Sequence, residues 1–151
     1  MCIKPVGVNL LKSLLCIFCI LALIFFSGCG LGDWGYDMQN GYSIWRVNSR
    51  SIVCGKNSGP NSIDRVVDDY VARFYYNSRY IFLYCVDVPE DVQEDVDSSD
   101  PNPDFYIIDV TTDEVTGPLT YEEFDDLLVY ILGENEALSW INTTPRPEGA
   151  E

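Results

Sequence analysis

Cys29 is the residue whose type and position most clearly allow chemistry. A thiol is a nucleophile that can be alkylated, and Cys29 directly follows the small residues Ser27 and Gly28. Small side chains let a protease approach the backbone at this point. In front of them lies an apolar run, residues 13–26, which contains no charged residue. The residues therefore allow both modification of the thiol and a cut in front of it.

The charges around this run indicate an export segment. Lys4 and Lys12 are the only charged residues before Asp33. A positive start, an apolar middle and small residues before a cut are the three parts of a secretory signal. The run of 14 residues is short of the roughly 20 that a helix needs to cross the hydrocarbon core. The sequence therefore predicts that residues 1–28 form a signal peptide that is removed.

The order Phe26-Ser27-Gly28-Cys29 resembles the lipobox of bacterial lipoproteins. In those proteins an enzyme adds diacylglycerol to the cysteine sulfur, and a peptidase then cuts before the cysteine. Two acyl chains, at about 0.8 kcal/mol for each buried methylene group, anchor a protein stably. The resemblance implies lipidation of Cys29 and a location at the cell membrane, on its extracytoplasmic face. The alternatives are a plain cleaved signal and an uncleaved anchor, in which Cys29 has no role.

The other five cysteines divide into two groups. Three would leave with the signal: Cys2, Cys16 and Cys19. Cys54 and Cys85 remain, both within predicted strands. Joined in a disulfide, they would stabilise the fold by roughly 3–4 kcal/mol on the chain-entropy model. Two separate buried thiols are the alternative.

Composition excludes several classes of function. Losing Lys4 and Lys12 with the signal would change the formal charge from −15 to −17. A chain with this much negative charge is not expected to bind nucleic acid, because that binding needs Lys and Arg side chains to neutralise the phosphates. Histidine is absent, which removes Ser-His and Cys-His pairs and the commonest metal ligand. We therefore expect no catalytic residue, no cofactor and no enzyme activity.

Carboxylates are the only plentiful groups that could catalyse a reaction. Asp68, Asp69 and Asp109 stand beside apolar strand residues and are the candidates for a glycosidase-like pair. Such a pair needs a separation of about 5 to 9 Å. Solvated charges at strand ends are the alternative interpretation.

The acidic segment 89–104 raises the question of calcium. Asp95, Asp97 and Asp100 have part of the required oxygen spacing. In a calcium loop that starts at Asp95, however, the sixth position is Asp100 rather than Gly, and the twelfth is Tyr106 rather than Glu. The sequence therefore predicts a solvated loop and no metal site.

The aromatic residues point to a binding partner. Ten Tyr, three Trp and four Phe follow residue 28, and most of them must pack in a core. Any of them that are exposed would suit a protein, peptide or glycan partner. The candidates are Trp34, Tyr36, Trp45 and Trp140.

Three hairpins and one helix should position these residues. Runs of β-branched and aromatic residues separated by turn residues predict the hairpins, in which 42–47 pairs with 51–54, 70–76 with 79–87, and 105–110 with 114–117. Residues 56–62 have the composition of a loop. Thr120 and Glu123 form a capping box, apolar residues follow at helical spacing, and Gly133 can end the helix. A short helical turn is expected over 135–140.

We therefore expect an α+β fold in which a C-terminal α-helix packs on an antiparallel β-sheet, a meander of about six strands. The N-terminal signal helix comes first, as residues 1–28. The lipidated cysteine and a tether follow at 29–41, a single globular domain at 42–142 and a flexible tail at 143–151.

Segments near both ends of the mature chain resemble one known group of proteins. They read Gly30-Leu31-Gly32-Asp33, Tyr36-Asp37, Gly41-Tyr42-Ser43-Ile44, Tyr106-Ile107-Ile108-Asp109, Val115-Thr116-Gly117-Pro118-Leu119-Thr120 and Glu123-Phe124. In this order they are similar to small lipoproteins of Gram-positive, often spore-forming, bacteria, which are classed as a domain of unknown function. The resemblance implies a location at the cell membrane and the size of the fold, and it implies no activity.

The absence of catalytic signals favours a non-enzymatic binding module at the outer face of the membrane. The alternative is an immunity-type, protective or inhibitory lipoprotein that sequesters a cationic partner, for which the negative charge would steer association. A carboxylate-based cell-wall hydrolase is the third expectation.

Replacing Cys29 with Ala should abolish incorporation of a radioactive fatty acid, because that thiol is the predicted lipid acceptor. Cells that express either form are labelled, and the protein is recovered and counted. Label on the wild type, none on Cys29→Ala and full label on Cys19→Ala is the expected pattern. An unlabelled wild type, or a labelled Cys29→Ala variant, would contradict it.

Overall fold

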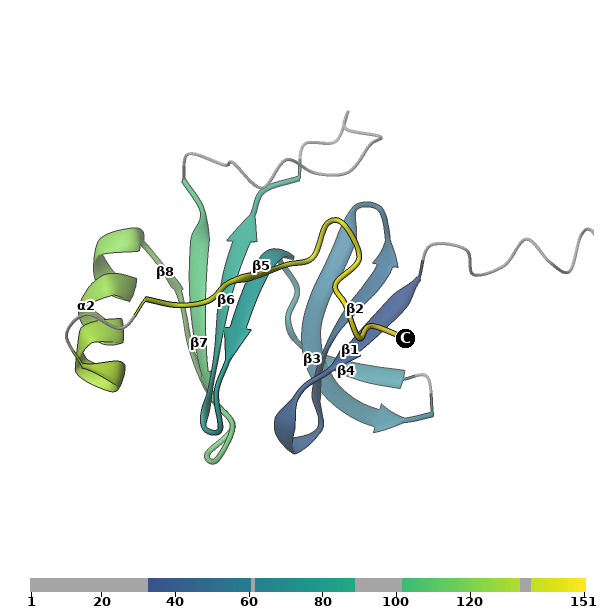
Figure 1. Ribbon diagram of the computed structural model, residues 1–151, viewed down its shortest axis with the longest axis horizontal. Helices are drawn as coiled ribbons and strands as arrows, with labels where there is room; N and C mark the ends of the chain where they lie inside the picture. Colours follow the sequence, from purple (N-terminus) through teal and green to yellow (C-terminus); the bar gives the residue numbers. More distant parts are fainter. Residues whose placement is uncertain (1–32, 61, 89–101, 134–136) are drawn as a thin grey trace, which may run out of the picture. The chain divides into compact units, whose positions relative to one another are not determined.

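A computed structural model describes residues 33–60, 62–88, 102–133 and 137–151 (Figure 1). The chain divides into two compact units, Met1–Leu31 and Gly32–Glu151, and every described residue belongs to the second. The predicted signal and Cys29 lie outside the described residues. Within the described ranges, no helix has the length and apolar character needed to cross a membrane.

The described strands form two antiparallel sheets. One sheet has four strands in sequence order, β1 (Trp34–Asp37), β2 (Tyr42–Asn48), β3 (Ser51–Gly59) and β4 (Ser62–Val67). The other has the order β8 (Glu114–Leu119), β7 (Asp104–Asp109), β6 (Tyr80–Val86), β5 (Tyr70–Tyr76) and β9 (Ile141–Asn142). A single-turn 3₁₀ helix, η1 (Gln39–Gly41), joins β1 to β2, and α2 (Tyr121–Leu132) follows β8. The predicted α+β class is confirmed, but these parts of the chain hold nine strands in two sheets rather than about six in one.

The three predicted hairpins are confirmed, as β2–β3, β5–β6 and β7–β8. Two of them turn on the same triplet, Asn-Ser-Arg. The side-chain oxygen of Asn48 accepts a hydrogen bond from the backbone N–H of Arg50 at 2.8 Å, and that of Asn77 accepts one from Arg79 at 2.9 Å. An Asn that bonds to the backbone two residues later forms an Asx turn. The repeat in the sequence is therefore a repeat of turn chemistry.

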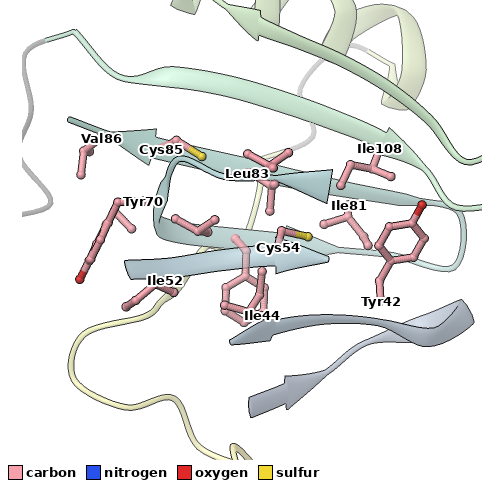
Figure 2. Packing of buried hydrophobic residues seen from close by; sticks show 14 of the residues in the cluster. Tyr42, Ile44, Ile52, Cys54, Tyr70, Ile81, Leu83, Cys85, Val86 and Ile108 are labelled. Carbon is pink, nitrogen blue, oxygen red and sulfur yellow. The ribbon is translucent and has the colours of Figure 1, made fainter. Parts of the chain in front are cut away.

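The main core lies between the two sheets (Figure 2). Alternate residues of β6, Ile81, Leu83 and Cys85, point toward the four-stranded sheet, where Ile44 and Cys54 meet them. The residues between them face the opposite way, toward α2. Because β6 lies inside its sheet and both faces are covered, it is apolar on both sides, as its sequence predicts.

A second apolar cluster holds α2 against the other face of the five-stranded sheet (Figure 1). Phe124 of α2 stacks on Phe105 of β7 with ring centroids 4.5 Å apart. The predicted capping box is present, since Thr120 Oγ1 accepts from the N–H of Glu123 and the N–H of Thr120 donates to Glu123 Oε2 at 2.9 Å. The helix ends before Gly133, whose φ of +92° suits glycine. The described unit therefore has three layers, the helix, the five-stranded sheet and the four-stranded sheet.

Two segments differ from the sequence prediction of a loop over 56–62 and a helical turn over 135–140. β3 continues to Gly59, and β4 begins at Ser62. β4 is the edge strand of its sheet, and the end of β3 that pairs with it is exposed, so the polar composition of this region looks like that of a loop. Of the second segment, residues 137–140 contain no helix, and 134–136 lie outside the described residues.

The segments predicted as tether and tail contact the sheets. Trp34–Asp37 form β1, inside the range assigned to the tether. Thr143 is buried, and its Oγ1 donates to the carbonyl of Val71 at 2.8 Å. Gly35 and Glu151 exchange two backbone hydrogen bonds of 2.9 and 2.8 Å. The C-terminal residues thus run from the five-stranded sheet to the edge of the other sheet (Figure 1).

Gly55→Ala should destabilise the fold, because β3 and β4 approach closely at this residue. A Cβ there would lie 2.5 Å from the backbone oxygen of Asp64, whereas at Gly59 on the same strand it would lie 4.0 Å from its nearest neighbour. We expect a loss of about 2 kcal/mol for Gly55→Ala and a change within about 0.5 kcal/mol for Gly59→Ala. Urea denaturation of the two variants measures the difference, and equal stabilities would contradict the close approach.

Candidate functional site

A groove of about 480 Å³ opens between α2, the five-stranded sheet and residues 137–140. Its apolar lining is mainly aromatic and comes from β6, β7, α2 and the segment after α2. The lining includes Tyr84, Phe105, Tyr121, Phe124, Leu128 and Trp140. The four that belong to α2 or follow it are far in sequence from the strands, so only the folded chain forms this groove.

The strand register positions the floor of the groove. Tyr84 and Phe105 are paired residues on adjacent strands, and their rings meet edge to face at 5.4 Å. Phe124 stacks on Phe105, and Trp140 lies 6.2 Å from Phe124 and 6.4 Å from Tyr84. Each ring therefore holds its neighbour in place, and the floor is a connected aromatic layer.

Two charged side chains line the groove on opposite sides. On the sheet side, the guanidinium of Arg73 lies over the ring of Tyr84, 4.9 Å from its centroid, within the range of a cation–π contact. On the helix side is the exposed Asp125. The groove is thus apolar at its floor, with a cation held by the sheet and a carboxylate held by the helix.

Tyr121, Phe124, Asp125 and Leu128 reach the groove from α2 because they are spaced at i, i+3, i+4 and i+7. Residues at this spacing share one side of a helix. Tyr121 is 68% exposed and forms the rim, with its ring 6.0 Å from that of Phe105. Tyr130 is 87% exposed on a different side of the same helix.

A second cleft, of about 500 Å³, lies over the four-stranded sheet. It is lined by Asp37, Trp45 and Asn57, among others, and the Asn57 amide donates to Asp37 at 3.2 Å. The indole N–H groups of Trp34 and Trp45 are buried, and neither has a hydrogen-bond partner within the described part of the chain. This cleft is more polar than the groove beside α2 and has carboxylates on its walls.

The four aromatic candidates from the sequence have different positions. Trp34 is buried, with 4% of its surface exposed. Tyr36, Trp45 and Trp140 are half-buried, and of these Trp140 lines the groove. Tyr121 and Tyr130 were not among the candidates predicted from the sequence, yet they are the most exposed large aromatics of the described residues. On a helical wheel Tyr130 lies off the apolar stripe of α2, which was a signal that could have found it, whereas Tyr121 lies on the same side as Phe124 and Leu128 and is exposed because it begins the helix.

The structure does not bring together the three carboxylates that the sequence nominated. Asp68 pairs with Arg65 at 3.2 Å, and Asp69 accepts a hydrogen bond from the hydroxyl of Tyr106. Both precede β5, whereas Asp109 lies beside the turn that follows β5. The seven residues of β5 span roughly 20 Å, which is more than a glycosidase pair allows.

Asp109 forms an ion pair with Arg79 at 2.8 Å. Hydrogen bonds from Arg79 and Thr111 lower the pKa of Asp109 to about 2, so the carboxylate stays charged and holds the β5–β6 turn. The calcium candidates Asp95, Asp97 and Asp100 lie outside the described residues. Within the described ranges, no three acidic or cysteine side chains come together in a way that could hold a metal ion.

Cys54 and Cys85 are both buried in the core between the sheets, and both carry free thiols (Figure 2). Cys54 belongs to β3 of one sheet and Cys85 to β6 of the other. Burial raises the pKa of Cys54 to about 12 and that of Cys85 above its usual range. A thiol with so high a pKa is inert toward alkylating reagents at neutral pH.

Comparison with protein-family models identifies a family. A family model described as "Protein of unknown function (DUF3997)" matches residues 39–129. The matched region runs from η1 to the last turn of α2, so it includes most of both sheets and the helix that walls the groove. No curated protein and no solved structure matches the chain.

Iodoacetamide should label neither Cys54 nor Cys85 in the folded protein at pH 8 and should label both in urea without reductant. Burial and the raised pKa of each thiol protect them until the core opens. Mass spectrometry of the mature chain after alkylation counts the modified thiols. A disulfide between the two would leave both unlabelled in urea until a reductant is added, and this result would contradict the free thiols.

Proposed function

Since the chain belongs to the DUF3997 family, whose function is unknown, we propose its role from its own geometry. The protein is a non-enzymatic binding module, held at the outer face of the cell membrane by lipid on Cys29. The groove beside α2 is its binding site, and the partner is a protein or peptide that inserts a side chain there.

The groove is the observation that carries this proposal. Binding sites are usually concave and mostly apolar, with a few polar groups that fix orientation, and have volumes of about 300–1,000 Å³. The groove has this size and this composition, with Arg73 and Asp125 as its polar groups. Large aromatic side chains contribute most of the energy at protein interfaces. Tyr121 and Trp140 offer such surface without any change in the fold.

The start of the first strand supports a role close to the membrane. β1 begins at Trp34, only five residues after Cys29. Five residues reach at most about 17 Å, so a lipid on Cys29 would hold β1 near the bilayer. A partner of this domain would then be a component of the cell surface or a molecule that reaches it.

The charge distribution favours a second candidate, an immunity-type or inhibitory protein that sequesters a cationic partner. The basic residues of the described ranges are already engaged. Lys56, Arg65 and Arg79 form ion pairs with carboxylates, and Arg146 donates to the carbonyl of Ala150. Arg46, Arg50 and Arg73 have interactions of their own. The remaining carboxylates leave a negative field that would speed the approach of a cation.

A photo-crosslinking amino acid in place of Tyr121 should capture the partner on intact cells, whereas the same residue in place of Tyr130 should not. Both tyrosines are exposed on α2, so neither change disturbs the core, but only Tyr121 lines the groove. Crosslinked products recovered through the lipoprotein are compared by mass spectrometry.

A product found at position 121 and absent at position 130 is the expected result. Loss of that product when Leu128, which also lines the groove, is changed to Asp would confirm that the groove is occupied. Identical products at both positions, or none at position 121, would overturn the proposal.

A further inference from the structure

We infer that the groove binds a cationic amphipathic peptide segment, with an apolar side chain on its aromatic floor and a neighbouring Lys or Arg beside Asp125. This inference rests on the proposed function, in which the groove takes a peptide or protein partner, and it names the chemistry of that partner.

The floor of the groove sets the apolar part of the ligand. Phe105, Phe124 and Leu128 lie against one another and present carbon to the groove. A polar ligand group placed there would lose its bonds to water and find none in return. A branched or aromatic side chain would instead replace water against these surfaces, which is favourable in proportion to the apolar area covered.

Tyr121 and Asp125 determine which charged group the ligand should carry. They are four residues apart on α2, so they are neighbours on one side of the helix, and both line the groove. An exposed aromatic ring attracts a cation to its face, and the adjacent carboxylate supplies an ion pair. Arg73 already shows the first of these contacts in the same groove, with its guanidinium over Tyr84.

The surrounding charge favours a cation at this rim. α2 carries four carboxylates, Glu122, Glu123, Asp125 and Asp126, and no basic residue. Glu123 is used by the capping box, whereas Glu122 stands three residues before Asp125, so the two repel one another across the helix surface. A bound Lys or Arg would relieve this repulsion. A ligand anion would instead be repelled by the same two carboxylates.

Arg73 determines the orientation of the ligand. Its charge is on the sheet side of the groove, over Tyr84, whereas Asp125 is on the helix side. The face of Tyr84 on the sheet side is thus already covered by a guanidinium, whereas Asp125 on the helix side attracts a cationic ligand group. The apolar side chain of the segment lies between the two, above Phe105.

The test uses the mature chain from residue 29 with Cys29→Ser, which carries no lipid and contains the whole compact unit Gly32–Glu151. Three fluorescent decapeptides serve as probes, with alternating Leu-Lys, Leu-Glu or Ser-Lys sequences. Fluorescence anisotropy at 0.15 M salt gives each Kd. We expect the Leu-Lys probe to bind at least about tenfold more tightly than either of the others, because only it supplies both apolar area and positive charge.

Asp125→Asn and Asp126→Asn are the matched variants. Each removes one negative charge from the same helix and leaves a side chain of the same size, but only Asp125 lines the groove. We expect Asp125→Asn to weaken binding of the Leu-Lys probe about threefold, the size of an exposed ion pair. Asp126→Asn should change it less than about 1.5-fold. The probe should also shift the NMR signal of the Trp140 indole N–H and leave that of Trp34 unchanged.

Equal weakening by the two variants would overturn the inference, since it would mean long-range attraction without contact at the groove. Binding of the Leu-Glu probe as tightly as the Leu-Lys probe would overturn the cationic class while leaving the groove as a peptide site. Absence of binding by all three probes would also overturn the inference. The proposed function fails separately, if crosslinking at position 121 yields no partner.

Discussion

Burial of the five-stranded sheet on both faces is the constraint on which the rest of the structure depends. Its central strand, β6, sends Ile81 and Leu83 toward the four-stranded sheet and Phe82 toward α2. Neither the helix nor the second sheet could bury its apolar side without this shared layer. The groove depends on the same layer, because its floor is the aromatic surface that α2 leaves uncovered beside Phe105.

The turns and the start of the helix were predictable from the sequence because residues adjacent in the chain determine them. The Asn-Ser-Arg triplets specify their turns through the side chains of Asn48 and Asn77, and Thr120 with Glu123 specifies the start of α2. The division into two sheets was not predictable in this way. β4 (Ser62–Val67) has polar residues at three of its six positions, and which strands pair across the core depends on contacts between residues far apart in the chain.

The candidate site was only partly predictable for the same reason. Trp140 was identified by its residue type, but its position over Tyr84 and Phe124 depends on how the chain returns after α2. Asp68, Asp69 and Asp109 share a residue type that could catalyse hydrolysis, yet they lie at opposite ends of β5. Residue type therefore identified candidate site residues, whereas the register of the strands determines which of them lie close enough to act together.

The layer order also determines how a bound partner would be presented. The chain joins the described unit at β1, in one outer layer, and the groove lies beside α2, in the other. Packed layers are about 10 Å apart, so two layer spacings, about 20 Å, separate the two. An occupant of the groove would therefore be held on the side of the five-stranded sheet that faces away from β1, the strand at which the chain enters the unit. The fold itself sets this separation, since it is the thickness of the packed layers.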